Sequence, residues 1–469
     1  MRTMSALLRV SVPALLLASL GQPVPAQLGF SKTDTPDPAN VLLIVADDLG
    51  VDMIGAYGEG TNPPPTPNID ALASNGVLFR NAYSNPAGSV TLATIETGRY
   101  AQRTGVGYVI YQGDQPLPRS EIILPEMLDL GTGGAYAHAL IGKWFLGNEK
   151  NGGNLSPNLM GYGHYEGIIA QLYLGGYDYF QHELVTNGVV SLSDTYATTE
   201  QVDSALDWIA GAPEPWYCQL AFNAPHTPIH EPPANLFTVP VPPVLEPHGD
   251  LTPFYMAMIE ALDTELGRLM ASVDPKVLAR TTVIFLGDNG TPGETVLPPF
   301  VPGHGKLTVY EGGVNVPLIV SGAQVVSPGR EETALVNTVD LFSTIADLAS
   351  VDLDDVMPPG AQLDAVSLYP YLRDPGVRDL RDTVFSEMFT PNGVTGPYEA
   401  QIYAIRDERY KIVRQSFGLG SPSYDEFYDL QLDPFEQSNL LAGGVPPTAE
   451  AARAYFRLDQ ELDRILKLP

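Results

Sequence analysis

Cysteine is almost absent from the sequence, since Cys218 is the single one among 469 residues. A lone cysteine forms no intramolecular disulfide, so a packed core, together with any bound metal, must stabilise the fold. Cys218 lies in the apolar run Trp216–Phe222, which predicts a buried and unreactive thiol.

Basic residues are also scarce. Lys and Arg number 25 against 55 Asp and Glu, which sets the formal net charge at −30. This charge disfavours nonspecific binding to nucleic acid or to anionic membranes, and we expect neither as a partner. It is typical of a solvated acidic surface in a salty or extracellular medium. An anionic substrate would therefore need a locally positive pocket.

Long apolar runs are missing as well, because no stretch after the N-terminal segment reaches the roughly 18 apolar residues of a transmembrane helix. The N-terminal segment has Arg2 and Arg9 before the apolar run Val10–Leu20, with small residues up to Ala26. This pattern predicts a cleavable signal peptide over residues 1–26, with an N-terminal membrane anchor as the alternative. We expect a periplasmic or secreted protein with no membrane attachment after signal removal.

Hydrophobic residues make up 44% of the chain, which is enough for a large core. Apolar β-branched runs alternate with segments of helical spacing. This favours an α/β fold in which helices flank a large, mostly parallel sheet. The predicted strands are Val41–Ala46, Leu140–Ile141, Tyr217–Phe222, Thr281–Leu286 and Val316–Val320. The predicted helices are Asn68–Asn75, Ser89–Glu96, Thr198–Ala210, Phe254–Val273 and Thr338–Ala349.

The pattern changes towards the C-terminus. We predict one large α/β domain over residues 38–375 and a smaller C-terminal α+β subdomain over residues 376–469, with a small antiparallel sheet and a terminal helix. The predicted elements of this subdomain are two short strands, an acidic turn and the helix: Gln401–Ile405, Lys411–Arg414, Asp425–Asn439 and Thr448–Leu466.

Polar side chains directly follow two of the predicted strands. Asp47 and Asp48 end the first strand, and Asp288 and Asn289 follow the fourth after one glycine. Each pair alone is more typical of a residue that caps a helix or turn. Together, at the carboxyl edge of a parallel sheet, they predict a site with hard oxygen ligands, which suits calcium or magnesium.

Several short motifs occur in an order that resembles sulfatases of the alkaline phosphatase superfamily. They are Ala46–Gly50, Thr66–Asp70, Thr97–Tyr100, Gly142–Trp144, Ala224–His226, Gly287–Gly290, Tyr310–Val314 and Asp433–Leu440. The resemblance covers about residues 38–441. It implies an alkaline phosphatase-like α/β domain, and a hydrolase of sulfuric esters whose substrate is an aryl or carbohydrate sulfate.

The resemblance also implies roles for individual residues. Four match the ligands of one divalent cation, usually calcium: Asp47, Asp48, Asp288 and Asn289. Three match groups that contact the sulfate oxygens or assist the leaving alcohol: Lys143, His226 and Lys306. These residue types suit the chemistry, because a metal ion and ammonium groups neutralise charge on oxygen and a histidine transfers a proton.

The sequence departs from the family pattern at the nucleophile. Family members have Cys or Ser followed by x-Pro-x-Arg, and the corresponding positions here are Gly88, Val90 and Leu92. No formylglycine can therefore form at Gly88. The His that usually follows Gly-Lys-Trp is replaced by Phe145, so a third polar group of the same region is apolar.

Three routes remain open for the missing nucleophile. Ser89 lies at the start of the predicted helix, where backbone N–H groups favour an anion, but one residue turns a helical side chain by about 100°. Thr91 lies further along, and for both residues hydrogen bonding at the helix start is the alternative role. The third route is attack by a water that the cation polarises in space beside Gly88.

Two other functions compete with the sulfuric-ester hydrolase, which we rank first. The same metal and lysine arrangement would serve a phosphodiester or phosphonate hydrolase. A noncatalytic, calcium-dependent binder of sulfated ligands is the other alternative. Specificity is expected in the loops, where Tyr165, Tyr173 and Tyr177 are candidates to stack on a sugar or aryl ring, with packing as their alternative role.

Overall fold

The computed structural model of the chain describes residues 39–243 and 249–467. The predicted signal peptide, residues 1–26, lies outside the described residues. Within the described ranges, no helix combines the length and the apolar character that crossing a membrane requires.

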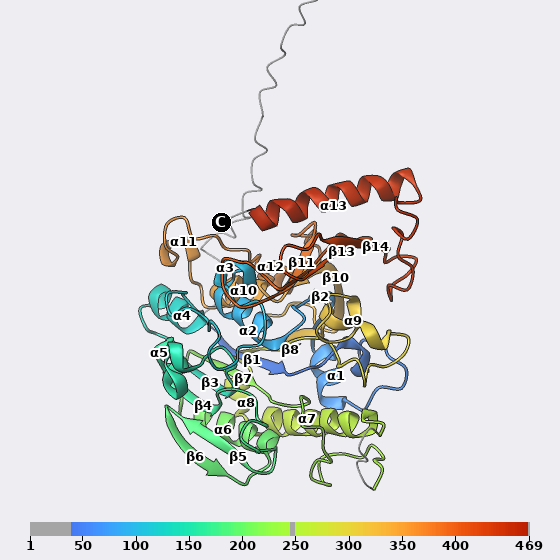
Figure 1. Cartoon of the computed structure of the whole chain (residues 1–469). Helices are drawn as coiled ribbons and strands as arrows, with labels where there is room; N and C mark the ends of the chain where they lie inside the picture. The colour runs from blue at the N-terminus through green and yellow to red at the C-terminus, as the bar shows by residue number, and fades with distance from the viewer. Residues whose placement is uncertain (1–38, 244–248, 468–469) are drawn as a thin grey trace, which may run out of the picture. The chain divides into compact units, whose positions relative to one another are not determined.

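Ten strands form the main sheet, in the order β10-β2-β9-β8-β1-β7-β3-β4-β5-β6 (Figure 1). Neighbouring strands from β8 to β4 are all parallel, and the pair β10-β2 is parallel too. The strands are β1 (Asn40–Ala46), β2 (Gly76–Tyr83), β3 (Ala137–Lys143), β4 (His164–Ile168), β5 (His182–Thr186), β6 (Val189–Ser193), β7 (Trp216–Ala221), β8 (Thr281–Gly287), β9 (Leu318–Gly322) and β10 (Arg330–Asn337). The predicted α/β class with a large, mostly parallel sheet is confirmed.

Successive residues of β1 alternate between two hydrophobic clusters. Val41, Leu43 and Val45 belong to one cluster, and Leu42 and Ile44 belong to the other. Because strand side chains point alternately to opposite faces, both faces of the sheet must be covered by helices. This explains why β1 has no polar residue between Val41 and its end.

Residues of α2, α4 and α10 pack in the first cluster, and residues of α1, α6 and α7 pack in the second. The longer helices are α1 (Pro67–Ser74), α2 (Gly88–Thr97), α4 (Leu124–Thr132), α6 (Ala197–Gly211), α7 (Thr252–Ser272), α10 (Asp340–Leu348) and α13 (Ala449–Lys467). The short ones are α3 (Ala101–Thr104), α5 (Ser156–Leu159), α8 (Pro275–Leu278), α9 (Glu311–Val314), α11 (Leu353–Val356) and α12 (Tyr369–Arg373). Single 3-10 turns are η1 (Val51–Met53), η2 (Glu149–Asn151), η3 (Gly153–Leu155) and η4 (Pro302–His304).

A second sheet has four antiparallel strands in the order β11-β12-β13-β14, and α13 packs against it (Figure 1). Its strands are β11 (Val384–Thr390), β12 (Ala400–Arg406), β13 (Tyr410–Phe417) and β14 (Tyr424–Asp429). The prediction of an acidic turn over Asp425–Asn439 is wrong in its first part, because residues up to Asp429 belong to β14. Pairing with Arg414 of β13, which lies 2.6 Å from Asp425, offsets the acidic charge there.

A buried ion pair connects the second sheet to the main one. Lys411 of β13 donates to Glu311 at the start of α9, with 2.8 Å between Nζ and Oε1. The N–H of Glu311 in turn donates to Glu436 Oε2 at 2.5 Å. The candidate site residue Lys306 lies in the loop just before α9. Lys411 and Glu436 therefore help to hold the segment that carries it in position.

Glu387 in β11 makes stability depend on pH. Burial raises the pKa of this carboxyl from 4.5 to about 8, and its Oε2 is buried without a hydrogen-bond partner. The folded state therefore retains a proton that the unfolded state loses above pH 4.5. The contribution of Glu387 to the free energy of unfolding is therefore largest at low pH. It falls by up to about 1.4 kcal/mol per pH unit as the pH rises from 4.5 towards the pKa of the folded state.

We expect Glu387→Gln to flatten the pH dependence, because glutamine has no proton to lose. Thermal unfolding of the wild type and the variant between pH 5 and 8 measures the difference, which should grow in favour of the variant at higher pH. Glu408→Gln, at an exposed position, is the control. A constant difference between wild type and Glu387→Gln over this range would contradict the assignment.

Candidate active site

Four neighbouring parallel strands, β8, β1, β7 and β3, end at the same edge of the main sheet. Site residues predicted from the sequence follow these ends: Asp288 and Asn289 after β8, Asp47 and Asp48 after β1, His226 after β7, and Lys143 at the end of β3. Loops at the carboxyl edge of a parallel sheet commonly build functional sites. The fold thus brings segments far apart in the sequence to one place.

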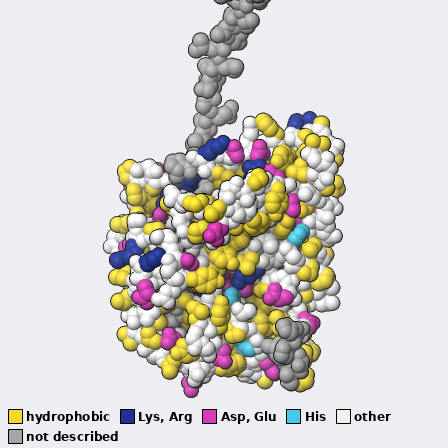
Figure 2. All heavy atoms as spheres, in the orientation of Figure 1, with side chains coloured by type: hydrophobic (Ala, Val, Ile, Leu, Met, Phe, Trp, Pro, Cys, Tyr) yellow, Lys and Arg dark blue, Asp and Glu magenta, His cyan; other side chains and the backbone are white. Residues whose placement is uncertain are grey.

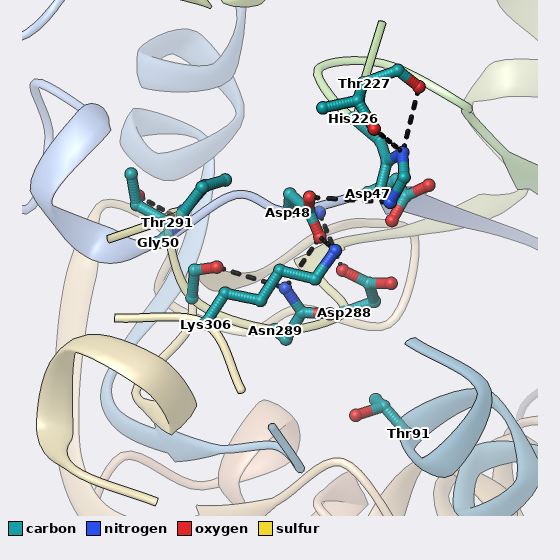
Figure 3. A network of polar contacts seen from close by, with 12 residues as sticks. Asp47, Asp48, Gly50, Thr91, His226, Thr227, Asp288, Asn289, Thr291 and Lys306 are labelled. Atoms are coloured by element: carbon teal, nitrogen blue, oxygen red, sulfur yellow. Dashed lines mark hydrogen bonds and ion pairs between the residues drawn. The ribbon is translucent and has the colours of Figure 1, made fainter. Parts of the chain in front are cut away.

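Asp48 is the centre of the polar network at this edge (Figure 3). Its N–H donates to Asp288 Oδ1 at 2.8 Å, and Asn289 Nδ2 donates to Asp48 Oδ1 at 2.9 Å. Its carbonyl oxygen accepts a hydrogen bond from the hydroxyl of Tyr255. Asp48 has a φ of 73°, a left-handed conformation that aspartate adopts more readily than most residues. The contacts from both sides hold it there.

Two lysines face the aspartates. Lys143 Nζ contacts Asp47 Oδ2, and Lys306 Nζ lies 2.5 Å from Asp48 Oδ1. Lys306 comes from the loop after η4, and its own N–H donates to the carbonyl oxygen of Thr291 at 2.9 Å. Both lysine side chains are largely buried, with 3% and 17% of their surface exposed. They are therefore directed into the site and away from bulk solvent.

His226 lies beside the same carboxylates. Its Nε2 is 3.8 Å from Asp48 Oδ2, and its Nδ1 is 3.0 Å from the carbonyl oxygen of Thr227. Nδ1 also lies 3.1 Å from Thr227 Oγ1, which can donate or accept. A carbonyl oxygen only accepts, so we assign the proton of the neutral ring to Nδ1, which leaves the lone pair on Nε2. Burial lowers the pKa of His226, although the charges of Asp47 and Asp48 oppose this effect.

The aspartates have unequal pKa values. Burial alone would raise the pKa of Asp48, but Lys306 and His226 hold it at about 2. The pKa of Asp288 is raised well above its usual value, first by burial and then by the charges of Asp47 and Asp48. The raised pKa favours a protonated Asp288, and a divalent cation nearby would favour its ionised form instead.

This donor set fits a divalent cation. Asp47, Asp48 and His226 form a buried group whose ligand atoms all lie within 4.8 Å of one another. The predicted ligands Asp288 and Asn289 lie beside this group, bonded to Asp48. Asp47 Oδ1 and Asn289 Oδ1 are buried without a hydrogen-bond partner, which is costly unless a ligand compensates. Carboxylate and amide oxygens are the ligands that hard divalent cations prefer.

Gly88 is the first residue of α2 and faces Asp288. A Cβ atom at this position would lie 2.3 Å from Asp288 Oδ2 and 3.7 Å from the ring of Phe145. The aspartate carboxylate therefore takes up the space that a side chain at position 88 needs, which corrects the expectation of free space beside Gly88. The Phe145 ring lies 3.9 Å from Lys143 Nζ, a cation–π contact. An aromatic ring is thus a direct neighbour of the lysine.

The two hydroxyl residues of α2 have other partners. Ser89 Oγ is fully buried and donates to the carbonyl oxygen of Phe145 at 2.9 Å. Thr91 Oγ1 accepts a hydrogen bond from the N–H of Asn85 at 3.0 Å, and Figure 3 shows its side chain apart from the aspartate cluster. Ser89 therefore joins α2 to the loop after β3, and Thr91 joins it to the segment before the helix, while no side chain of the described residues caps the helix start.

Two residues that shape the site had not been predicted. Tyr255 comes from α7 and bonds to the backbone of Asp48, and no local pattern in the sequence marks it. Thr291 directly follows the motif Gly287–Gly290. Its Oγ1 accepts from the N–H of Gly50 at 3.2 Å and donates to Asp52 Oδ1 at 2.6 Å. The Thr291 hydroxyl thus connects the loop after β8 to the loop after β1 through two hydrogen bonds.

Comparison with known proteins agrees with this architecture. The chain is 29% identical to human arylsulfatase A over 479 residues, which cover 91% of this chain and 88% of the relative. It is 28% identical to N-acetylgalactosamine-6-sulfatase of the pig over 377 residues, 73% of this chain and 67% of the relative. The crystal structure of Ps i-CgsB in complex with k-i-k-neocarrahexaose has the same fold, with a TM-score of 0.72 and 22% identity over 92% of this chain and 93% of that chain.

Two family profiles match the sequence. The profile of the N-sulphoglucosamine sulphohydrolase C-terminal region matches residues 304–463, which include the second sheet. The sulfatase profile matches residues 39–351, the larger part of the chain, including every strand end that contributes to the site. With its fold and its cluster of acidic, amide and lysine side chains, this chain belongs to the sulfatase family.

Proposed function

We propose that the protein is an exported, calcium-dependent hydrolase of sulfuric esters, with an aryl or carbohydrate sulfate as substrate. The observation that carries the proposal is the convergence of three buried aspartates and two inward lysines at one sheet edge. Relatives named arylsulfatase and N-acetylgalactosamine-6-sulfatase support these two substrate classes. The signal pattern of residues 1–26 supports export. The predicted ligands all bind through oxygen, which supports calcium as the cation.

The charge of the site suits a substrate with one negative charge. Lys143 and Lys306 carry two positive charges against three carboxylates when all of these are ionised, and a neutral His226 adds none. The net charge of these five side chains is then −1, and a divalent cation would change the net charge of the site to +1. A sulfate monoester carries one negative charge, whereas a phosphate monoester carries nearly two at neutral pH.

Each polar group has a proposed role. A divalent cation held by the aspartates and Asn289 would stabilise negative charge on the sulfate oxygens. Lys143 contacts the same charge. Burial alone would lower the pKa of Lys306, but Asp48 and Asp47 raise it above its usual value. Lys306 therefore holds its proton until the ester oxygen departs and then donates it to that oxygen.

We assign the attack on sulfur to water, because position 88 has no side chain and Ser89 bonds to Phe145. A proton of the water passes to Nε2 of His226, whose lone pair is available in the neutral ring. The water oxygen bonds to sulfur, the bond between sulfur and the ester oxygen breaks, and the departing oxygen takes the proton of Lys306. The products are the free alcohol and sulfate.

The apolar character of the former nucleophile region favours one alternative. Val90 and Leu92 are buried in the first hydrophobic cluster together with Phe145, and Leu92 and Phe145 contribute packing where the family pattern has an arginine and a histidine. This arrangement is compatible with a noncatalytic, calcium-dependent binder of sulfated ligands. A phosphodiester hydrolase is the other alternative, since a phosphodiester also carries a single negative charge.

Turnover of 4-nitrophenyl sulfate and bis-4-nitrophenyl phosphate by the wild type and by Ser89→Ala tests the proposal. We expect the sulfate ester to be hydrolysed in the presence of calcium, and Ser89→Ala to retain the wild-type rate within about threefold. Its hydroxyl contributes one neutral hydrogen bond, worth about 1 kcal/mol, to stability.

Other outcomes distinguish the alternatives. Loss of sulfate hydrolysis in a Ser89→Ala protein that remains folded, with its melting temperature lowered no more than the loss of one hydrogen bond explains, would identify Ser89 as the nucleophile and refute attack by water. Faster turnover of the phosphodiester would favour the phosphodiesterase. If neither ester is hydrolysed but sulfated ligands bind, the protein is a binder.

A further inference from the structure

Tyr173 extends over the site from the loop between β4 and β5. Its ring is parallel to the imidazole of His226, with 6.4 Å between the centroids and 4° between the planes. The residue is 39% exposed. Its hydroxyl has no hydrogen-bond partner among the described residues. Tyr173 is therefore a large aromatic side chain beside a candidate catalytic group, with much of its surface open to solvent.

Tyr111 lies near the same place, in the loop between α3 and α4. It is 48% exposed. Its N–H donates to Asp114 Oδ2 at 2.8 Å, and its carbonyl oxygen accepts from Asn148 Nδ2 at 3.0 Å. Burial raises the pKa of Tyr111, as do Tyr173 and Asp114, while Lys306 lowers it, so Tyr173 and Lys306 both act electrostatically on its hydroxyl. The backbone bonds fix the loop that presents the ring.

The other candidate tyrosines have different roles. Tyr165 is fully buried, and its hydroxyl donates to the carbonyl oxygen of Gly142 at 3.2 Å. Tyr177 donates to Glu183 Oε1 at 3.1 Å on the surface. Of the three tyrosines that the sequence suggested, only Tyr173 borders the site, and the fold adds Tyr111, which the sequence did not mark.

Hydrophobic side chains are prominent on the face that Figure 2 shows, where they border a basic side chain and a histidine near the middle. Exposed aromatic rings offer apolar area that a ligand can cover on binding. An apolar rim around a charged centre fits a ligand that has one anionic group and one largely uncharged ring.

We propose that Tyr111 and Tyr173, here called the tyrosine pair, bind the ring of the alcohol moiety of a monosulfated substrate. The inference rests on the proposed function, because it assumes that the sulfate group binds at Lys143 and Lys306. The tyrosine pair then selects esters of a ring over esters of an acyclic alcohol. Both an aryl ring and the C–H face of a pyranose stack on a tyrosine, which is the chemistry the two ligand classes share.

Calorimetric titration with three sulfate esters tests the tyrosine pair. The esters are 4-nitrophenyl sulfate, galactose 6-sulfate and the acyclic methyl sulfate, each titrated into the full-length mature protein with calcium. We expect Tyr173→Ala and Tyr111→Ala to weaken binding of at least one ring ester by about two- to tenfold, the usual range for one aromatic contact. Binding of methyl sulfate should change by less than about twofold.

Two further variants sharpen the test. Tyr173→Phe retains the ring and should bind as the wild type does. Tyr424→Ala removes a tyrosine of β14 that is also 48% exposed, and should have no effect on any ester. The ring ester whose binding weakens more in Tyr173→Ala identifies an aryl or a pyranose as the preferred ring.

The titrations distinguish loss of ring binding by the tyrosine pair from loss of anion binding at the lysines. If all three esters bind but Tyr173→Ala and Tyr111→Ala weaken none of the ring esters, or weaken methyl sulfate equally, the tyrosine pair is not a ring-binding site. If no ester binds to the wild type, the anion site itself is refuted, and the tyrosine pair with it.

Discussion

Replacement of Asp288 by alanine is expected to abolish the stabilisation of the protein by calcium. In the wild type, a cation at 100 times its Kd would add about 2.7 kcal/mol to the free energy of unfolding. Asp288 supplies one of three clustered carboxylates and positions Asp48 through a backbone hydrogen bond of 2.8 Å. Differential scanning calorimetry with calcium and with a chelator measures the melting temperature of each protein.

Asp263→Asn is a matched control for this prediction. Asp263 of α7 is also a buried carboxylate, but it accepts from the N–H groups of Asn68 and Ile69 in α1 instead of contacting the aspartate cluster. We expect its calcium-induced shift to equal that of the wild type, even if its baseline melting temperature differs. A wild-type melting temperature that is the same in calcium and in chelator would remove the metal site from the proposal.

Replacement of Lys306 by alanine is expected to lower kcat for sulfate esters by about 10²-fold or more, the range seen when a group that stabilises developing charge is removed. Lys306 lies 2.5 Å from Asp48 Oδ1, and it is the proposed proton donor to the leaving oxygen. Steady-state kinetics with 4-nitrophenyl sulfate measures kcat and KM separately.

A series of substrates with different leaving groups distinguishes proton donation by Lys306 from contact of Lys306 with the anion. An ester of a more acidic phenol needs less help from a proton donor, so the rate loss in Lys306→Ala should shrink as the leaving group becomes more acidic. Lys276→Ala, which removes an exposed lysine of α8, should match the wild type. A uniform loss over all leaving groups would refute proton donation and leave Lys306 as an anion contact.

The region that has lost the nucleophile is well packed in this protein. Val90, Leu92 and Phe145 belong to one hydrophobic cluster, and Asp288 Oδ2 occupies the place of a side chain at Gly88. Restoring one polar residue would therefore create a clash or a buried unpaired group. All three residues belong to the same packed core, so a polar residue at any one of these positions would be surrounded by apolar neighbours.

The buried parallel strands and the amphipathic helices were predictable because their patterns are strong. β1, β7 and β8 are short apolar runs followed by turn residues, and α7 has regular helical spacing over 21 residues. Strands with mixed polarity were not predicted. β2 contains Arg80 and Asn81, and β10 begins with charged residues. Their pairing partners decide these elements, and a sequence window does not contain them.

The sequence by itself determined the α/β class, the carboxylate and amide side chains at the ends of two strands and the lack of a side chain at position 88, since each of these depends on residues adjacent in the chain. Only the tertiary structure decided that Ser89 bonds to a backbone carbonyl, that Asp288 takes up the space beside Gly88, and that Tyr111 and Tyr173 lie near Lys306 and His226. These contacts join segments separated by many residues. Their geometry follows from how the strands and loops pack, which local patterns do not specify.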